Sequence, residues 1–272
     1  MTHFTGKVAV VTGAGSGIGR ALSVELARRG AKLAICDVDT IGLAETEALV
    51  KAEGADVKAD HLDVSQRELV LAYADGVAAH FGKVNLVFNN AGIAFTGNIE
   101  EMSFKDIDRV MDVDFWGVVS GTKAFLPHLV ESGDGHIINI SSIFGLFSVP
   151  TQSAYNAAKF AVRGFTEALR MEMILNERPV KVTCVHPGGI KTNIAKKQEQ
   201  VEGVDHDELA KQFDKLARMS PAKAANIILK GVEKNKARVL IGADAWVLDK
   251  FVRLSGPGYA RAVAAFSKRN GL

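Results

Sequence analysis

The sequence predicts an α/β protein of the doubly wound type, in which a mostly parallel seven-stranded sheet carries helices on both faces. Short apolar runs rich in β-branched residues alternate with longer helical patterns from Lys7 to Val185. A glycine run follows the first of these strands directly. Because no linker or low-complexity stretch interrupts the alternation, residues 1–272 are expected to form one domain.

The individual elements follow from apolar runs and helical periodicity taken in order. Strands are expected at residues 8–11, 33–36, 57–59, 86–88, 136–140 and 180–185, with a seventh at 238–241. Helices are expected at residues 18–29, 42–52, 67–81, 104–129 and 154–176. A polar and charged stretch at 188–219 is out of pattern and is interpreted as a substrate lid, while residues 243–272 form a C-terminal helical extension.

Composition excludes several classes of protein. A hydrophobic share of 47% and a net charge of +2 argue against a disordered chain and against a nucleic-acid partner. Cys36 and Cys184 lie in apolar runs and are expected to be buried free thiols, and neither they nor the histidines, His186 included, have metal-ligand spacing. The start of the chain has no apolar signal core and no run is long enough to span a membrane, so a soluble, cytoplasmic protein is expected.

The glycine run indicates a site for a dinucleotide pyrophosphate. Its glycines fit the frame Gly-x-x-x-Gly-x-Gly at Gly13, Gly17 and Gly19, with Ser16 and Ile18 between them. In a strand–loop–helix unit, the backbone N–H groups of such a loop and the helix N-terminus face a phosphate. The alternative is an ordinary glycine-rich turn, because short motifs also occur by chance.

Asp37 ends the second strand and favours NAD over NADP. A carboxylate there can accept hydrogen bonds from the adenosine ribose and repel a 2′-phosphate. The positions where a basic residue would bind that phosphate hold Ser16 and Val38, and Arg20 is expected only to cover the first helical turn. The alternative for Asp37 is a solvated carboxylate without a ligand.

Further candidates lie where the third and fourth strands end. Asp63 and Val64 close the third strand, and Asn90, Ala91 and Gly92 follow the fourth. Open α/β sheets bind their ligands at the carboxyl ends of the strands. Small residues after the fourth strand also let the backbone approach a cofactor closely.

Tyr155 and Lys159 indicate acid/base chemistry. They are four residues apart in a helical stretch, so they share one face about 6 Å apart along the axis. A phenol with a pKa of about 10 is a poor base at neutral pH, and a neighbouring ammonium lowers that pKa. Ser142 follows a strand, so its hydroxyl can donate to a substrate oxygen at the same edge. A tyrosine and a lysine at this spacing are common in helices by chance, and the pair alone is more readily explained by structural packing.

Together, these motifs resemble the short-chain dehydrogenase/reductases in order and spacing, from residue 4 to about residue 195. The motifs are Gly13-x-x-x-Gly17-x-Gly19, Asn89-Asn90-Ala91-Gly92, Ser142, Tyr155-x-x-x-Lys159 and Pro187-Gly188. The resemblance implies a seven-stranded Rossmann sheet, a nicotinamide cofactor, and hydride transfer to or from an alcohol or ketone carbon. It also implies a homotetramer or dimer formed through the helices at 104–129 and 154–176.

The resemblance also assigns roles to residues. The tyrosine would be the acid/base, the serine would polarise the carbonyl, and the lysine would in addition bind the nicotinamide ribose. Pro187, Gly188, Ile190 and Thr192 would lie along the cofactor, with the last two contacting the carboxamide.

Asp114 departs from the family pattern, which has asparagine at this position in support of a proton path to the lysine. An ionised Asp114 beside Lys159 could hold the lysine charged and weaken its effect on Tyr155, or a water could bridge the two. We expect Asp114 to act as a replacement in the same role. The alternative is a dinucleotide-binding sensor or scaffold with weak catalysis. A sugar-nucleotide epimerase is disfavoured by chain length and glycine spacing.

Apolar residues predict a small hydrophobic alcohol or ketone as the substrate. Phe95 and most of residues 143–150 are apolar and flank the predicted site, although half of them are expected to belong to the core. In the C-terminal extension, Trp246, Val247, Phe251 and Leu254 recur at helical spacing among basic residues. This pattern is consistent with an interfacial membrane helix, but packing on the domain or across a subunit boundary is favoured.

Overall fold

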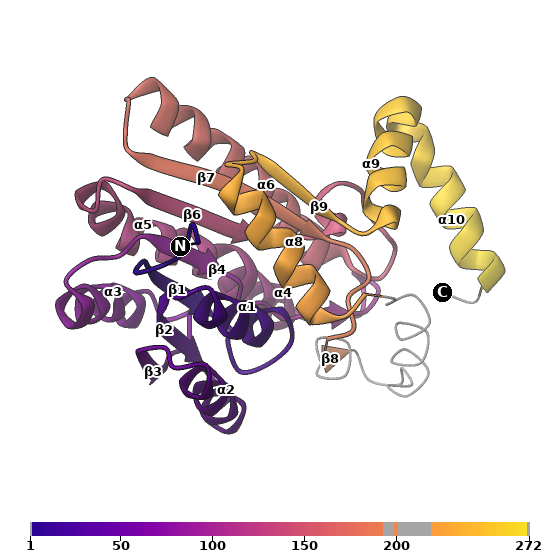
Figure 1. The fold of residues 1–272 in the computed structure, drawn as a ribbon. Coiled ribbons are helices and arrows are strands. Elements are labelled where there is room, and N and C mark those ends of the chain that lie inside the picture. Colours follow the sequence, from indigo (N-terminus) through magenta and orange to yellow (C-terminus); the bar gives the residue numbers. More distant parts are fainter. Residues whose placement is uncertain (1, 193–198, 201–218, 271–272) are drawn as a thin grey trace.

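The computed structural model describes residues 2–192, 199–200 and 219–270 and contains a parallel sheet in the strand order β3-β2-β1-β4-β6-β7-β9 (Figure 1). Every pairing in this sheet is parallel, which confirms the predicted doubly wound α/β fold. The strands are β1 (Val8–Thr12), β2 (Lys32–Asp37), β3 (Val57–His61), β4 (Leu86–Asn89), β6 (Gly135–Ile140), β7 (Val180–Pro187) and β9 (Arg238–Ile241).

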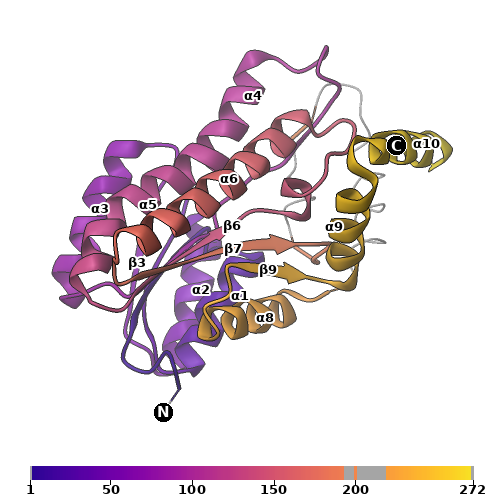
Figure 2. The ribbon, with the colours of Figure 1, turned by 90° about the horizontal axis from the view of Figure 1, so that it is seen from above.

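Helices cover both faces of the sheet, as Figure 2 shows. One face is covered by α1 (Gly17–Arg28), α2 (Thr40–Ala52) and α8 (Pro221–Glu233), whose apolar residues join a core cluster that includes Leu22, Leu43 and Ile228. The other face is covered by α3 (Arg67–Phe81), α5 (Gly117–Glu131) and α6 (Ser153–Leu175), with a second cluster that includes Phe125 and Leu169. Burial on both faces explains why the central strands are almost continuously apolar.

The helix predicted at residues 104–129 contains an irregularity. It consists of α4 (Phe104–Met111), a π-helical turn η1 (Asp112–Trp116) and α5, in direct succession. Ser103 and Asp106 form a capping box at its start, which fixes where the helix begins. π-Helical turns hold one extra residue per turn and are frequent at functional sites, and this one carries Asp114.

Helix α8 was not predicted from the sequence. It begins at Pro221, and the Ser220 side chain caps it by accepting a hydrogen bond from the Lys223 N–H at 3.3 Å. Most of the stretch interpreted as a lid lies outside the described residues. Its described ends include a bridge between Ile190 and Met219, and residues 199–200 (β8) pair with β5 (Phe95–Thr96).

The chain ends in helices α9 (Ala243–Ser255) and α10 (Tyr259–Asn270), joined by the 3₁₀ turn η3 (Gly256–Gly258). Both helices lie beyond the end of β9 at one end of the sheet (Figures 1 and 2). Within the described part of the chain, no helix is both long and apolar enough to span a bilayer.

Candidate active and cofactor site

The predicted site residues gather along the carboxyl edge of the sheet. The registers Val11 with Phe88, Phe88 with Ile138, and Asn139 with Cys184 align β1, β4, β6 and β7 side by side. Because all four strands run in the same direction, the segments that follow them emerge at one edge. The sheet therefore brings together segments that are more than a hundred residues apart.

The glycine loop leaves no room for side chains at Gly13, Gly17 and Gly19. Gly13 has a φ of +65°, and a Cβ there would lie 2.7 Å from the Cα of Ala91. Gly17 has a φ of +54°, and a Cβ on Gly19 would collide with the Gly13 carbonyl group. Each position therefore needs glycine, either for its backbone conformation or for close packing. The loop is compact, and Ser16 occupies the N-cap position of the helix that follows.

Asn90 supports this loop through its side chain. Its Nδ2 donates to the carbonyl oxygens of Thr12 at 2.9 Å and Gly13 at 3.1 Å. In return, the Thr12 hydroxyl accepts from the backbone N–H groups of Asn90 and Ala91, both at 3.0 Å. Thr12 had no role in the sequence analysis. The sequence feature that could have indicated its role is a hydroxyl side chain at the last position of the first strand, directly before the glycines.

Asp37 is tied to the same loop. Its carboxylate accepts from the backbone N–H of Gly15 at 2.7 Å and from that of Asp39 at 2.8 Å. Arg20, which was expected to cover the helix surface, instead pairs with Glu45 at 2.7 Å and donates to the Gly15 carbonyl oxygen at 2.5 Å. The Arg20 guanidinium is therefore occupied by protein acceptors.

The remaining cofactor candidates differ in what their side chains contact. The carboxylate of Asp63 accepts from the N–H and the hydroxyl of Ser65, while Val64 is buried against Gly117. Ile18 packs on the core beneath the loop. These three side chains are therefore engaged within the protein.

After β7 the chain returns to the glycine loop. The strand ends at Pro187, and the Gly188 N–H donates to the carbonyl oxygen of Ile241 at 2.9 Å. Ile190 is only 3% exposed and lies in the core, whereas the side chain of Thr192 lies against Gly17, where a Cβ would be 3.2 Å from its methyl carbon. Of these residues, Thr192 comes nearest to the predicted pyrophosphate site.

Asp114 and Lys159 form a buried ion pair. Asp114 is fully buried, and its Oδ2 lies 3.0 Å from the Lys159 Nζ. Its Oδ1 accepts from the backbone N–H of Ile93 at 2.7 Å, and the lysine Nζ also donates to the Ile140 carbonyl oxygen at 3.3 Å. Gly92 borders the pair, since a Cβ there would lie 3.3 Å from the ammonium. The contact is therefore direct and does not need a bridging water.

The pair controls the charge of the lysine. Burial alone would lower the pKa of Lys159, but Asp114 and Tyr155 outweigh it and raise that pKa above its ordinary value. Burial raises the pKa of Asp114, and the lysine and the Ile93 N–H offset part of this rise. Asp114 thus favours a charged Lys159, as the sequence analysis considered.

Tyr155 lies next to this pair, with the Lys159 Nζ 5.5 Å from the centre of its ring. Burial raises the pKa of Tyr155, Lys159 and a hydrogen bond with Ser142 lower it, and Asp114 raises it again. The net direction is upward, whereas the sequence analysis considered only the lowering effect of the lysine. Without a ligand, Tyr155 is therefore a neutral phenol at neutral pH.

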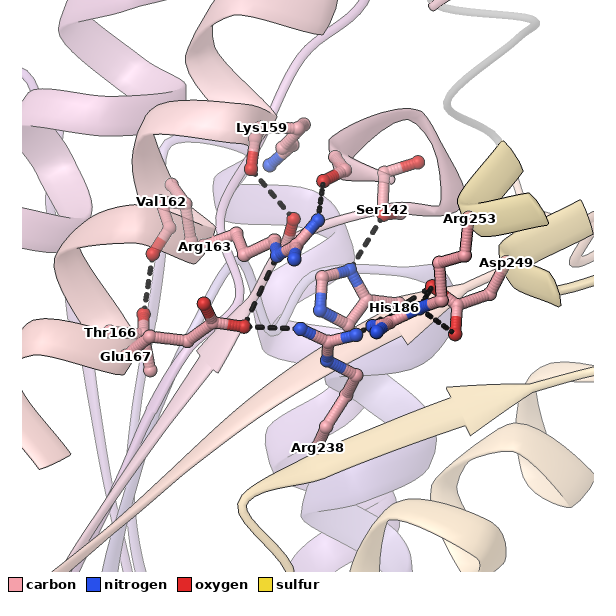
Figure 3. A network of polar contacts seen from close by, with 12 residues as sticks. Ser142, Lys159, Val162, Arg163, Thr166, Glu167, His186, Arg238, Asp249 and Arg253 are labelled. Carbon is pink, nitrogen blue, oxygen red and sulfur yellow. Dashed lines mark hydrogen bonds and ion pairs between the residues drawn. The ribbon is translucent and has the colours of Figure 1, made fainter. Parts of the chain in front are cut away.

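Ser142 is positioned by its own turn and by His186. Its hydroxyl oxygen accepts from the Phe144 N–H at 3.1 Å, which caps the 3₁₀ turn η2 (Ile143–Gly145). Its carbonyl oxygen lies 2.9 Å from the Nδ1 of His186, as Figure 3 shows. Burial lowers the pKa of His186 to about 4, so the ring is neutral and its Nδ1 carries the hydrogen that it donates. From the sequence, His186 was notable only for lacking metal-ligand spacing, because no local pattern marks its contact with Ser142.

An ion-pair network surrounds His186 (Figure 3). Arg238 of β9 pairs with Glu167 of α6 and lies 3.6 Å from Asp249 of α9. Glu167 also pairs with Arg163 at 3.1 Å, and Asp249 pairs with Arg253 at 3.0 Å. The network links α9 to the helix that carries Tyr155 and Lys159.

The apolar segment after Ser142 is partly core, as expected. Ile143, Leu146 and Phe147 are buried in a cluster with Ala245 of α9. Phe144 is half-buried, and the edge of its ring meets that of Tyr155, with the ring centres 6.2 Å apart. Phe95 belongs to a separate buried cluster that Tyr155 also contacts. The wall beside the tyrosine is therefore apolar.

Comparison with known proteins points to one family. A protein-family model described as short chain dehydrogenase matches residues 7–203. "Putative oxidoreductase SadH" of Mycobacterium tuberculosis is 61% identical over 266 residues, which cover 97% of this chain and 96% of that protein. "Estradiol 17-beta-dehydrogenase 11" of Homo sapiens is 37% identical over 193 residues, covering 71% of this chain and 64% of that protein.

Solved structures share the whole architecture. A short-chain dehydrogenase/reductase from Burkholderia phymatum, solved in complex with NAD, superposes with a TM-score of 0.87. It is 31% identical in sequence, and the match covers 94% of this chain and 95% of that one. The similarity therefore extends beyond the segment matched by the family model.

Proposed function

Because the chain belongs to the short-chain dehydrogenase/reductase family, we propose that this oxidoreductase transfers a hydride between NAD(H) and a hydrophobic secondary alcohol or ketone. The observation that carries the proposal is the meeting of Ser142, Tyr155 and Lys159 at the carboxyl edge of the sheet, beside a loop with no room for side chains. Acid, base and phosphate-binding backbone are then within one site.

The glycine loop fits a dinucleotide. At Gly13, Gly17 and Gly19 a side chain would be strained or would collide with the protein, so bare backbone lines the loop. The bare backbone and the N-terminus of α1 suit the pyrophosphate, and Thr192 closes the loop from the other side. When bound, the nicotinamide accepts or supplies the hydride.

The side chains of the site move the proton. Tyr155 donates its phenolic proton to a ketone oxygen during reduction and accepts a proton from the alcohol during oxidation. The Ser142 oxygen accepts from the Phe144 N–H and its hydrogen bonds to Tyr155, so that a bound substrate oxygen would take over the serine hydrogen from the tyrosine. Lys159, held charged by Asp114, lowers the pKa of the phenol and opposes the effect of burial.

A second candidate function is a dinucleotide-binding sensor or scaffold with slow chemistry. It is favoured by one observation, because the Asp114 carboxylate raises the pKa of Tyr155 and so disfavours the phenolate. The intact site around Ser142 and Tyr155 supports the enzyme more strongly. The two differ in turnover and not in binding of the cofactor.

The experiment that tests the proposal is a screen of substrates. Secondary alcohols with steroid, retinoid, fatty or aryl bodies are incubated with the protein and NAD, and NADH is followed by its absorbance. The apolar wall at Phe144 and the likeness to a protein named for estradiol support this choice of panel. Turnover of such an alcohol supports the enzyme, whereas binding of NAD without any turnover supports the sensor.

Asp37 should set the preference for NAD over NADP. The carboxylate would face a 2′-phosphate at close range, and like charges so placed cost several kcal/mol, so we expect NAD(H) to bind about a hundredfold tighter than NADP(H). In Asp37→Ser the ratio should fall below about tenfold. Fluorescence titration with NADH and NADPH measures both dissociation constants.

The control for Asp37 is Asp75→Ser, which changes an exposed carboxylate that pairs with His128 on the far helix layer. This variant should keep the ratio of the native protein. Tighter binding of NADP(H) by the native protein would remove the role assigned to Asp37.

His186 should act on turnover through Ser142. His186→Leu removes the donor to the Ser142 carbonyl, and the loss of one such bond should lower kcat by about tenfold while the KM for NAD stays the same. In His186→Asn, the amide Nδ2 replaces the donating Nδ1, so this variant should recover most of the rate. Steady-state kinetics at saturating NAD separates kcat from KM.

The control for His186 is His136→Leu, which removes another buried histidine, one that contacts Thr183 at the base of the sheet. It should cost stability without a selective loss of kcat. Equal kinetics for His186→Leu and His186→Asn would contradict the positioning role.

A further inference from the structure

Helix α9 has two apolar faces, and only one of them is covered. Ala245, Leu248 and Val252 pack into the cluster that contains Leu146 and Phe147. On the opposite face, four apolar side chains are exposed to solvent by 42% to 89%, and these are Trp246, Val247, Phe251 and Leu254. The spacing of these four residues places them along one continuous side of the helix. We call them the outer face of α9.

The sequence favoured packing of these four residues on the domain or across a subunit boundary. The part of the domain that the structure describes does not cover them, since Leu254 is 89% and Val247 66% exposed. The residues that do pack on the domain are those at the intervening helical positions, such as Leu248 and Val252. Among the residues that the structure describes, the outer face thus has no covering partner.

The outer face is also positively charged. Lys250 lies on it, with its Nζ 5.3 Å from the centre of the Trp246 ring. Arg253 lies at its edge, and α10 adds exposed Arg261 and Lys268. Between positions 245 and 268 the sequence has one acidic residue, Asp249. Its carboxylate already pairs with Arg238 and Arg253, so it does not offset the charge of the other basic residues. Since the whole chain has a net charge of only +2, basic charge is concentrated in this region.

We propose that the outer face of α9 docks on a membrane surface that contains anionic lipids. A helix of this kind, with tryptophan and leucine on one side and lysine or arginine beside them, lies in the plane of the headgroups. Each basic residue near an anionic surface strengthens binding by about fivefold. The absence of a spanning helix among the described residues is consistent with a helix that lies on the bilayer.

A second copy of this chain would fit the outer face less well. The usual contact between two copies has two-fold symmetry, so the same patch meets itself. The basic residues beside the outer face, Lys250 and Arg253, would then face the same basic patch of the second copy, and like charges brought together weaken binding. Lipid phosphates supply the opposite charge instead.

Docking would bring the candidate site close to the lipid. The covered face of α9 packs on Leu146 and Phe147, in the segment that directly follows Ser142. The same segment is joined to the C-terminal region by a hydrogen bond from the Ser148 N–H to the Tyr259 hydroxyl at 3.1 Å. The inference goes beyond the proposed function and does not depend on it, because binding to lipid is measured without a substrate.

The test is sedimentation of the full-length protein with vesicles. Vesicles of phosphatidylcholine with added phosphatidylglycerol should bind the protein, while vesicles of phosphatidylcholine alone should bind it much less. The double variant Trp246→Ser, Leu254→Ser should bind at least about tenfold more weakly, because it loses two apolar side chains. Lys250→Glu should also bind more weakly, and its deficit should disappear at high salt.

The matched control is Leu175→Ser, which changes a leucine of α6 that is 81% exposed. It should bind vesicles as the native protein does. Circular dichroism confirms that each variant is folded.

Three results would overturn the proposal. The first is no binding to either kind of vesicle, and the second is equal binding by the control and the double variant. The third is that the double variant forms a smaller assembly in light scattering while its vesicle binding is unchanged. The last result would assign the outer face to a second copy. A protein that binds vesicles but turns over no alcohol would contradict the proposed function alone.

Discussion

Replacing Tyr155 with phenylalanine is expected to lower kcat by about a thousandfold, which lies within the usual contribution of a general acid or base. The variant removes one hydroxyl and keeps the ring, so the edge contacts with Phe144 persist. The loss should appear in both directions of the reaction, because the same oxygen gives the proton to the ketone and takes it from the alcohol. Stopped-flow or steady-state measurement of NADH absorbance, with the best alcohol of the screen, determines kcat.

Cofactor binding separates this effect from misfolding. Lys159 and the glycine loop are unchanged in Tyr155→Phe, so the dissociation constant for NADH should stay within a few-fold of the native value. The matched control is Tyr259→Phe, which removes a hydroxyl that contacts Ser148 beside the site without facing the reacting atoms. It should keep most of the activity. Normal turnover in Tyr155→Phe would refute the proposed mechanism.

Replacing Asp114 with leucine should lower the free energy of unfolding by about 3–5 kcal/mol, the usual cost of removing one partner from a buried ion pair. Lys159 would be left buried, with the Ile140 carbonyl oxygen as its remaining acceptor among the contacts described above. The backbone N–H of Ile93 would lose its acceptor as well. Denaturant titration followed by circular dichroism measures the change. The control is Asp75→Leu, which breaks an exposed ion pair with His128. If Asp114→Leu lowered the free energy of unfolding as little as this control does, the stabilising role of the buried pair would be contradicted.

Asp114→Asn distinguishes charge from structure at the same position. The amide can still accept from Ile93, so this variant should be more stable than the leucine variant. The negative charge of Asp114 raises the pKa of Tyr155, and its removal should lower that pKa. Alcohol oxidation needs the phenolate, so its rise with pH should move to lower pH in the asparagine variant. An unchanged or upward-shifted profile would show that the carboxylate does not act on the phenol in this way.

The parts of the fold that depend on local pattern were predictable. The seven strands were predicted within two residues at each end, most of them because buried parallel strands are short apolar runs bounded by polar residues. The tight loop after the first strand was predictable from its glycines, since Gly13 and Gly17 have backbone angles that other residues avoid. Their structural requirements are visible in the residue types themselves.

Other features depend on contacts that no short pattern encodes. Helix α8 was missed because it follows a long polar stretch, although Ser220 and Pro221 together form a recognisable helix start. Arg20 lies in sequence beside the glycine loop, yet its partner Glu45 comes from the next helix. The pKa of Tyr155 was expected to be lowered by Lys159, whereas burial has the larger effect and raises it.

The π-helical turn at Asp112–Trp116 has a consequence for engineering of this chain. If this turn became regular α-helix with its residue count unchanged, everything downstream would rotate by about 100° relative to α4, because the extra residue would no longer be absorbed within one turn. Gly117, which fits against Val64, and Gly121, which fits against Asn89, would then leave their positions on the sheet. A helix exchanged between relatives at this place must therefore preserve the π-helical turn as well as the chemistry of Asp114.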